Sequence, residues 1–163
     1  MPDTLNVSRR VLNLGCGNQP ITACAGEEVI NHDIRRHRSE IDVVHDLNVL
    51  PWPWADESFD CIVAQAVLEH LQITLIQSMD ECWRLLRPEG TLDLRLPWWQ
   101  SDSSYRDPTH RWFFSLDTLE IFDPDTDYGR AYGFYTERKW RFVRKPALSR
   151  LKTSIVALMQ VCK

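Results

Sequence analysis

Residues 10–17 read RVLNLGCG, an apolar run of strand length that ends in two glycines separated by one residue. The run over residues 10–14 predicts a short buried strand. Glycine lets the backbone turn tightly and come close to a ligand, so Gly15 and Gly17 predict a ligand-binding turn at the end of this strand. A plain tight turn is the alternative, because a glycine pair alone is weak evidence.

Short apolar runs bounded by polar turns recur along the chain. This pattern is typical of strands in a mostly parallel sheet. The last run, residues 155–159, would also fit a helix. Together with the first run, the segments predict seven strands, the other six being residues 29–33, 41–46, 59–64, 91–96, 139–143 and 155–159.

Two helices are predicted between these strands. Apolar residues recur at helical spacing from Leu75 to Leu86, and the segment 87–90, which contains a proline and a glycine, is expected to end that helix. Ser115 is a good N-cap for a shorter helix that runs to about Phe122. Residues 123–138, rich in Asp, Gly and Tyr, are interpreted as a long loop.

These elements predict a single α/β domain over residues 1–163, with a Rossmann-like seven-stranded, mostly parallel sheet and a C-terminal antiparallel hairpin. The first two crossovers, of about a dozen and about eight residues, are too short for full helices, so we expect a minimal version of the fold. Asp93 and Arg95 alternate with leucines, whereas a strand covered on both faces is apolar on both. One sheet face is therefore expected to be thinly covered. On that face we expect Asp93 and Arg95 to pair with each other, to contact polar loops or to line a homodimer contact.

Composition restricts the partners. The chain has 163 residues and a net charge of -4, so it lacks the basic field that holds a nucleic-acid backbone, and no nucleic-acid partner is expected. Its 5 cysteines include no CxxC pair, which favours a reduced cytoplasmic protein and predicts no metal site. Because no apolar run approaches membrane-spanning length and no signal-peptide core is present, we expect no membrane association.

Acidic residues end the second and third predicted strands. A carboxylate at Asp33 can accept both hydroxyls of a ribose, although a solvated turn acid is the alternative. Asp46, followed by Leu47, can contact the edge of an adenine. Because the carboxyl ends of parallel strands share one edge of a sheet, these residues and the glycine turn should meet in one crevice.

The segments LNLGCG (12–17), NHD (31–33), DVVHDLNVLPWPWADESFDCIVAQAVLEHL (42–71) and ECWRLLRPEGTL (81–92) resemble class I S-adenosylmethionine-dependent methyltransferases, in particular the small methyltransferase type 11 group. The resemblance covers roughly residues 10–122 and implies S-adenosylmethionine as the cofactor. It implies that Gly15 and Gly17 approach the methionine moiety, that Asp33 holds the ribose, that Asp46 and Leu47 frame the adenine, and that Gln65 starts the loop beneath the sulfonium. The cofactor-binding residues that we predict are Asn13, Leu14, Gly15, Cys16, Gly17, Asp33, Ile34, Asp46, Leu47 and Gln65.

One position departs from the family pattern. Asn13 stands where the family usually has an acid. An amide can still hydrogen-bond the methionine amino group, but without charge assistance.

The segment DPTHRWFF (107–114) follows the fifth strand and should lie over the same crevice, and similar methyltransferases often carry a DPxH-type segment here. Methyl transfer requires alignment, and also proton removal when the acceptor is a hydroxyl. His110 is the first candidate for the base and His70 the second, since imidazole titrates near neutral pH. The alternatives are a structural hydrogen bond for His110 and packing for His70. The residues predicted to bind substrate are Trp98, Trp99, Tyr105, Asp107 and Arg111.

The sequence leaves three candidate functions. The first is a methyltransferase that acts on a small-molecule or carbohydrate-like acceptor at oxygen. The second is a non-catalytic module that binds S-adenosylmethionine or a nucleotide, which Asn13 and the short crossovers motivate. The third, a nucleotide-dependent dehydrogenase, is disfavoured because the third glycine of its fingerprint is missing. Gln65-Ala66-Val67 replaces the Asn/Asp-Pro-Pro-aromatic loop that a nucleic-acid amino-methyltransferase would need.

Overall fold

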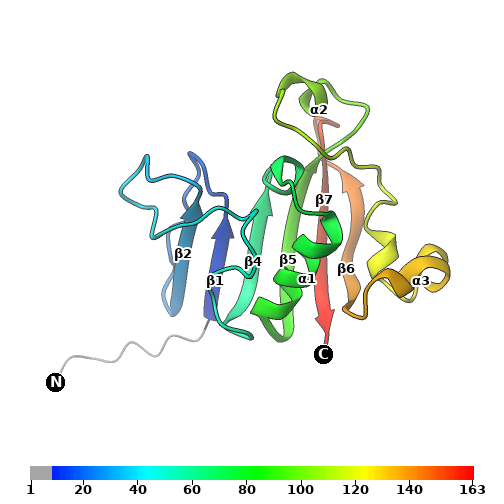
Figure 1. The fold of residues 1–163 in the computed structure, drawn as a ribbon, viewed down its shortest axis with the longest axis horizontal. Coiled ribbons are helices and arrows are strands. Elements are labelled where there is room, and N and C mark those ends of the chain that lie inside the picture. Colours follow the sequence, from blue (N-terminus) through cyan, green and yellow to red (C-terminus); the bar gives the residue numbers. More distant parts are fainter. Residues whose placement is uncertain (1–8) are drawn as a thin grey trace.

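A seven-stranded sheet in the order β3-β2-β1-β4-β5-β7-β6 forms the centre of the computed structural model, which describes residues 9–163 (Figure 1). Strands β1 to β5 run parallel, and β7 is antiparallel to both β5 and β6. The predicted mostly parallel α/β sheet with a C-terminal antiparallel hairpin is therefore confirmed. The strands are β1 (Arg9–Leu14), β2 (Glu27–Asp33), β3 (Val43–Val44), β4 (Phe59–Gln65), β5 (Leu86–Pro97), β6 (Lys139–Leu148) and β7 (Ser154–Cys162).

The helix predicted from the apolar spacing is α1 (Leu75–Leu85). It begins at a capping box in which the Thr74 side chain accepts from the Gln77 N–H and the Gln77 side chain accepts from the Thr74 N–H. The remaining helical segments are short: η1 (Leu68–His70), α2 (Asp102–Arg106), η2 (Glu120–Phe122), α3 (Asp127–Tyr132) and η3 (Gly133–Tyr135).

The structure corrects two predictions in the second half of the chain. The helix expected from Ser115 to Phe122 is wrong, because the Ser115 N–H donates to the Thr118 hydroxyl in a turn and only η2 follows. The long loop expected over 123–138 is also wrong, because it contains α3, which Thr126 caps by accepting from the Gly129 N–H. A Cβ at Gly129 would lie 1.9 Å from the Asp123 carbonyl oxygen, so this close contact requires glycine.

Two strand boundaries differ as well. The third strand, predicted over residues 41–46, has only the two residues of β3. The segment 87–90 lies inside β5 instead of forming a separate turn, because Leu86 already pairs with Phe59 of β4. Glu89, with φ of 63°, marks the irregularity there.

The sheet has one covered face and one open face. Within the described residues no helix lies between β1 and β2 or between β2 and β3, as their short spacing predicted. Along β7, Ile155, Ala157 and Met159 are buried while the residues between them are half-buried. Helix α1 covers the buried face (Figure 1). On the open face Asp93 lies 3.8 Å from Arg144 of β6.

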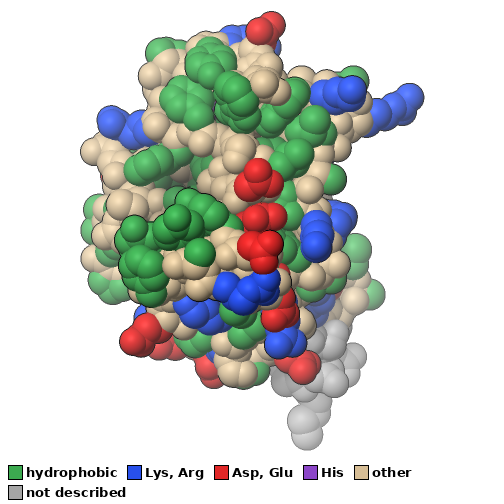
Figure 2. All heavy atoms as spheres, turned by 90° about the vertical axis from the view of Figure 1, so that its right-hand side faces the viewer, with side chains coloured by type: hydrophobic (Ala, Val, Ile, Leu, Met, Phe, Trp, Pro, Cys, Tyr) green, Lys and Arg blue, Asp and Glu red, His purple; other side chains and the backbone are tan. Residues whose placement is uncertain are grey.

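The edge of the molecule formed by α3 and β6 carries exposed aromatic side chains. Figure 2 faces this edge and shows hydrophobic side chains gathered in patches. The exposed aromatic residues of α3 and η3 are Tyr128, Tyr132, Phe134 and Tyr135. None of the helices formed by residues 9–163 has the length and apolar character needed to cross a bilayer.

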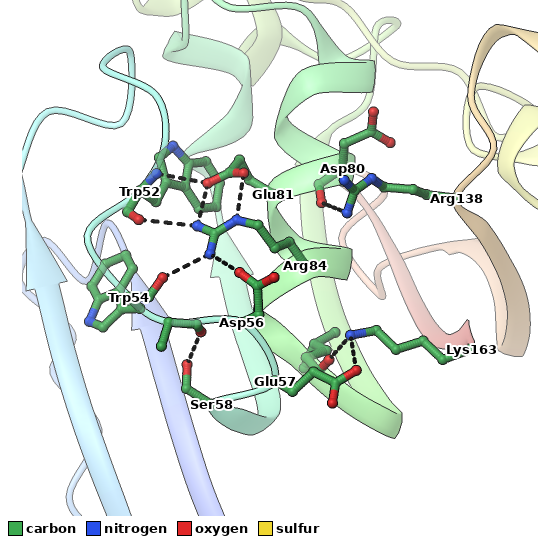
Figure 3. Close-up of polar contacts among 12 residues, drawn as sticks. Trp52, Trp54, Asp56, Glu57, Ser58, Asp80, Glu81, Arg84, Arg138 and Lys163 are labelled. Carbon is green, nitrogen blue, oxygen red and sulfur yellow. Dashed lines mark hydrogen bonds and ion pairs between the residues drawn. The ribbon is translucent and has the colours of Figure 1, made fainter.

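Arg84 of α1 holds the loop between β3 and β4 (Figure 3). Its guanidinium donates to both carboxylate oxygens of Glu81 (2.8 and 2.7 Å), to Asp56 (2.7 Å) and to the carbonyls of Trp52 (3.1 Å) and Trp54 (2.8 Å). Burial alone would raise the pKa of the Glu81 carboxyl. Hydrogen bonds from Arg84 and from the Trp52 N–H outweigh burial and hold this pKa below its ordinary value.

We predict that Arg84→Gln lowers the free energy of unfolding by about 2 kcal/mol at pH 7, because it leaves the Glu81 carboxylate without its ionic partner. Since the pKa of Glu81 is lowered in the folded state, this stabilisation is present above the ordinary pKa of 4.5 and is lost as the pH falls through the folded-state pKa. Urea unfolding at pH 7 and near pH 3 should therefore show a smaller difference at the lower pH.

Arg87→Gln is the matched control. Its guanidinium contacts Asp60 at 2.9 Å in a more exposed ion pair, so the expected loss is below about 1 kcal/mol. An equal loss for the Arg84 variant at both pH values would contradict the assignment.

Candidate functional site

Three consecutive backbone N–H groups tie the turn after β1 to the end of β2. The Gly15 N–H donates to Nδ1 of His32 (3.2 Å), the Cys16 N–H to the His32 carbonyl (2.8 Å) and the Gly17 N–H to the Asp33 carboxylate (2.8 Å). Gly15 and Gly17 have φ of 56° and 53°, in the left-handed region that favours glycine. The two glycines are thus needed for the path of the turn.

His32 connects this turn to the segment after β3. Its Nε2–H donates to the His45 carbonyl at 2.9 Å while Nδ1 accepts from Gly15, which fixes the neutral imidazole. Burial lowers the pKa of His32, which favours the same neutral form.

The turn after β4 packs against the turn after β1. A Cβ added to Gly15 would lie 2.5 Å from Cγ2 of Val67, so this position accepts only glycine while Val67 is in place. Ala66 has φ of 54°, a conformation that costs a non-glycine residue roughly 1–2 kcal/mol, and its N–H donates to the Arg95 carbonyl at 2.9 Å. Strained residues of this kind concentrate at binding and catalytic sites.

Two hollows flank the glycine turn. The first, of about 320 Å³, is lined by six of the predicted cofactor residues: Gly15, Gly17, Asp33, Ile34, Asp46 and Leu47. The second, of about 640 Å³, adds three more: Asn13, Cys16 and Gln65. Leu14 lies apart, because its side chain is fully buried in the core.

Two hydrogen bonds orient the side-chain amide of Asn13. Its Nδ2 donates to Asn31 Oδ1 (2.9 Å) and to the Gln19 carbonyl (3.2 Å). Its Oδ1 is therefore the atom available for a ligand in the second hollow.

A third hollow, of about 450 Å³, is lined by Ala66 and by three residues predicted for catalysis or substrate binding: His70, Asp107 and His110. Ala66 lines all three hollows, and His70 lines both the first and the third. The third hollow therefore adjoins the glycine turn. Its other polar lining residues are Glu69, Arg95, Ser103, Arg106 and Ser154.

Glu69 and the two histidines form a cluster in this hollow. The His70 and His110 rings meet edge to face, with centroids 4.7 Å apart. The Glu69 side chain is only 1% exposed, and its Oε1 lies 3.9 Å from Nε2 of His110. Its Oε2 has no hydrogen-bond partner among the described residues. Burial raises the pKa of Glu69 to about 7.

Both histidines are oriented by hydrogen bonds at Nδ1. His110 Nδ1 donates to the Ser104 carbonyl at 3.0 Å. His70 Nδ1 donates to Thr109 Oγ1 at 2.8 Å, since that hydroxyl gives its own proton to Asp107 at 2.7 Å. Each neutral imidazole therefore has an unprotonated Nε2.

The predicted aromatic and basic substrate residues lie outside this hollow. Trp98 packs against the core beside Phe114, Trp99 is exposed, and Tyr105 is exposed and stacks on Phe113 with ring centroids 5.1 Å apart. Arg111 donates its backbone N–H to the Glu69 carbonyl while its side chain is exposed.

Sequence reasoning missed Glu69, Arg95 and Arg106 as residues of the hollow. The signal for Glu69 was a single carboxylate within the apolar run AVLEHL. Arg95 alternates with leucines, a pattern that indicates the open sheet face and gives no sign of the hollow.

The chain is similar to known proteins in sequence and in fold. The sequence pattern of a family described as "Methyltransferase domain" matches residues 12–93. No curated protein sequence matches the chain. Among solved structures, an S-adenosylmethionine-dependent methyltransferase from Archaeoglobus fulgidus has a TM-score of 0.58 at 16% identity, covering 96% of this chain and 87% of that chain. One from Aquifex aeolicus has a TM-score of 0.62 at 12% identity, covering 97% and 85%.

A third structure contains bound ligands. Phosphoethanolamine N-methyltransferase 1 from Haemonchus contortus, in complex with phosphoethanolamine and S-adenosylhomocysteine, has a TM-score of 0.63 at 15% identity. The alignment covers 94% of this chain and 39% of that chain. At these identities the likeness concerns the fold.

We predict that Gly15→Ala lowers the free energy of unfolding by about 3 kcal/mol, from left-handed strain together with the clash at Val67. Gly17→Ala is the matched control and should cost only about 1 kcal/mol. A Cβ at Gly17 would lie 4.0 Å from the Gly15 carbonyl oxygen, so it would not clash there. Urea unfolding measures both changes.

The double variant Gly15→Ala/Val67→Ala should lose less stability than the sum of its single variants, because the smaller side chain removes the clash. Equal losses for the two glycine variants, with no coupling to Val67, would rule out the proposed contact between the two turns.

Proposed function

The chain belongs to the methyltransferase domain family, and from this premise we propose that it transfers a methyl group from S-adenosylmethionine to an oxygen of a small-molecule or carbohydrate-like acceptor. The observation that carries the proposal is the meeting of three hollows at Ala66. A cofactor in the hollows at the glycine turn would adjoin an acceptor beside Glu69 and the two histidines.

The residues of the first hollow fit this cofactor. Its volume of about 320 Å³ lies within the range of small-ligand sites. Asp33 Oδ2 accepts from the Gly17 N–H at 2.8 Å, whereas Oδ1 accepts only a long hydrogen bond of 3.4 Å from the Arg35 N–H and keeps a lone pair for a ribose hydroxyl. The apolar side chains of Ile34 and Leu47 line the same hollow as Asp46, as an adenine ring would require. We propose these as the ribose and adenine contacts.

The third hollow fits a polar acceptor. Arg95, Arg106 and Asp107 supply charged groups, and Ser103 supplies a hydroxyl. Two guanidinium groups would favour an acceptor with an acidic substituent beside its reacting hydroxyl.

S-adenosylmethionine supplies a methyl group on a positively charged sulfur, and transfer forms the acceptor O–C bond as the C–S bond breaks and sulfur keeps the electron pair. His110 is our first candidate to accept the hydroxyl proton, because its Nδ1–H is held by Ser104 and its Nε2 is unprotonated. His70 has the same arrangement through Thr109 and is the second candidate. Both rings are thereby held in one orientation for the acceptor.

We also propose that a second copy of the chain covers the open sheet face. Val156 and Leu158 are half-buried apolar residues there. Asp93 and Arg95 carry opposite charges on the same strand, and a twofold axis would set Asp93 of one copy against Arg95 of the other.

A pair of variants tests the proposed function. We predict that Asp33→Asn weakens S-adenosylmethionine binding about tenfold, because it removes the charge while leaving an oxygen for Gly17. His110→Gln should leave cofactor binding unchanged and lower turnover at least about hundredfold. Calorimetry measures binding. Release of S-adenosylhomocysteine, followed by mass analysis of products from a panel of sugars, phenols and hydroxy acids, measures turnover.

Asp125→Asn, a charge change at an exposed carboxylate beside α3, is the control and should bind the cofactor normally. Absence of S-adenosylmethionine binding by the folded wild-type chain would sink the proposal. Binding without turnover on any acceptor would favour a non-catalytic module.

We predict that the wild-type chain sediments as a dimer and that Leu158→Lys sediments as a monomer, because a charge would be desolvated in the contact. Leu151→Lys, at a residue that is 81% exposed in the turn before β7, is the control and should stay dimeric. A monomeric wild-type chain at all soluble concentrations would exclude this contact.

A further inference from the structure

Glu69, His70 and His110 have the composition and spacing of a metal site. One ligand atom from each lies within 4.8 Å of the others, and the described residues contain no other such group of three. The cluster contains no cysteine, so the absence of a CxxC pair, from which we expected no metal, does not bear on it. The three residues come from η1 and from the loop after α2, which only the fold brings together.

Buried Glu69 is the independent sign that this cluster binds a ligand. A carboxylate oxygen that is removed from water and lacks a hydrogen-bond partner is costly. Oε2 of Glu69 is in this state, whereas Oε1 is near His110 Nε2. A bound cation would satisfy both the charge and the unpaired oxygen.

The hydrogen bonds that would orient two metal-binding imidazoles are already present. A histidine that binds a metal through one nitrogen usually donates its other N–H to a carbonyl or a carboxylate, which fixes the ring. His110 donates to the Ser104 carbonyl, and His70 donates through the Thr109 hydroxyl to Asp107. Both Nε2 atoms are thereby left as ligand atoms.

We propose that Glu69, together with Nε2 of His70 and of His110, binds a divalent first-row transition cation that holds the acceptor oxygen beside the transferred methyl group. This inference deepens the proposed function and depends on it for the identity of the acceptor. Two imidazoles and one carboxylate suit Mn²⁺, Fe²⁺, Co²⁺ or Zn²⁺ better than Mg²⁺ or Ca²⁺, which prefer oxygen ligands throughout.

The three ligand atoms must move closer together to share one cation. Ligand atoms about 2.1 Å from one cation lie roughly 3 to 3.4 Å apart. Glu69 Oε1 and His110 Nε2 are 3.9 Å apart, and all three ligand atoms lie within 4.8 Å of one another, so each pair has to close by less than about 2 Å. Three protein ligands leave coordination positions open toward the third hollow, where the acceptor would enter.

The cation changes the role of the imidazoles. With Nε2 engaged as a ligand, His110 no longer accepts the proton. The cation lowers the pKa of the acceptor hydroxyl instead, and the released proton passes to solvent water in the hollow. Loss of turnover in His110→Gln is expected for either role, so metal binding has to be measured directly.

The test is calorimetric titration of Zn²⁺ and Mn²⁺ into the full chain after treatment with a chelator, together with the visible absorption of added Co²⁺. The wild-type chain should bind one cation. Glu69→Gln and His110→Gln should each weaken binding at least about tenfold and remove the Co²⁺ bands. Far-ultraviolet circular dichroism checks that both variants fold.

Two control variants identify adventitious binding. His37→Gln and Cys24→Ser remove an exposed imidazole and an exposed thiol outside the cluster and should leave cation binding unchanged. No cation binding by the wild-type chain would overturn the inference. So would binding that persists in Glu69→Gln and His110→Gln, or that His37→Gln or Cys24→Ser abolishes.

A further comparison separates this inference from the proposed function. After a chelator has removed bound metal from the chain, adding Mn²⁺ or Zn²⁺ should raise the rate of methyl transfer at least about tenfold. S-adenosylmethionine binding should stay unchanged. Equal methyl transfer with and without cation would overturn the cation site and leave the proposed function standing. Failure of the chain to bind S-adenosylmethionine, with cation bound, would remove the proposed function alone.

Discussion

The glycine turn after β1 is the constraint on which the site depends. Its three N–H groups are all used by His32 and Asp33 at the end of β2. Its other side allows no Cβ at Gly15, because Val67 is in contact. The ends of β1, β2 and β4 are therefore held together by backbone hydrogen bonds and close packing. Because the hydrogen bonds are directional and the packing contact acts only at short range, the three strand ends keep one relative position at the sheet edge.

This constraint explains how a fold with so few helices can keep a defined site. Neither crossover beside β2 contains a helix, and one sheet face is only partly covered. Rigidity at the site comes instead from local polar contacts, such as His32 between Gly15 and His45. Arg84 makes a comparable set of contacts at the C-terminal end of α1, where its guanidinium donates to two carbonyls of the loop before β4. Ala66, in its strained conformation, lies where the three hollows meet.

The seven strands and α1 could be predicted because their signals are local: apolar runs bounded by turns, and one helical apolar face with a cap. The helix expected at Ser115 failed because the hydroxyl of Thr118 accepts the Ser115 N–H and forms a turn. Helix α3 was missed because its glycine and aspartates are typical of loops. The glycine is required there by contact with the Asp123 carbonyl, a packing effect that no pattern within 123–138 reveals.

The sequence alone determined the order of the elements and the residue types at the strand ends, since a glycine turn and a terminal carboxylate are encoded within a few positions of each strand. The tertiary structure decided which side chains share a hollow. It separated Trp98, Trp99, Tyr105 and Arg111 from His110, and it brought Glu69, Arg95 and Arg106 to it. It also buried Glu69 without a partner for Oε2. Burial and the distance between residues some 40 positions apart depend on how the chain packs, and spacing along the sequence cannot specify them.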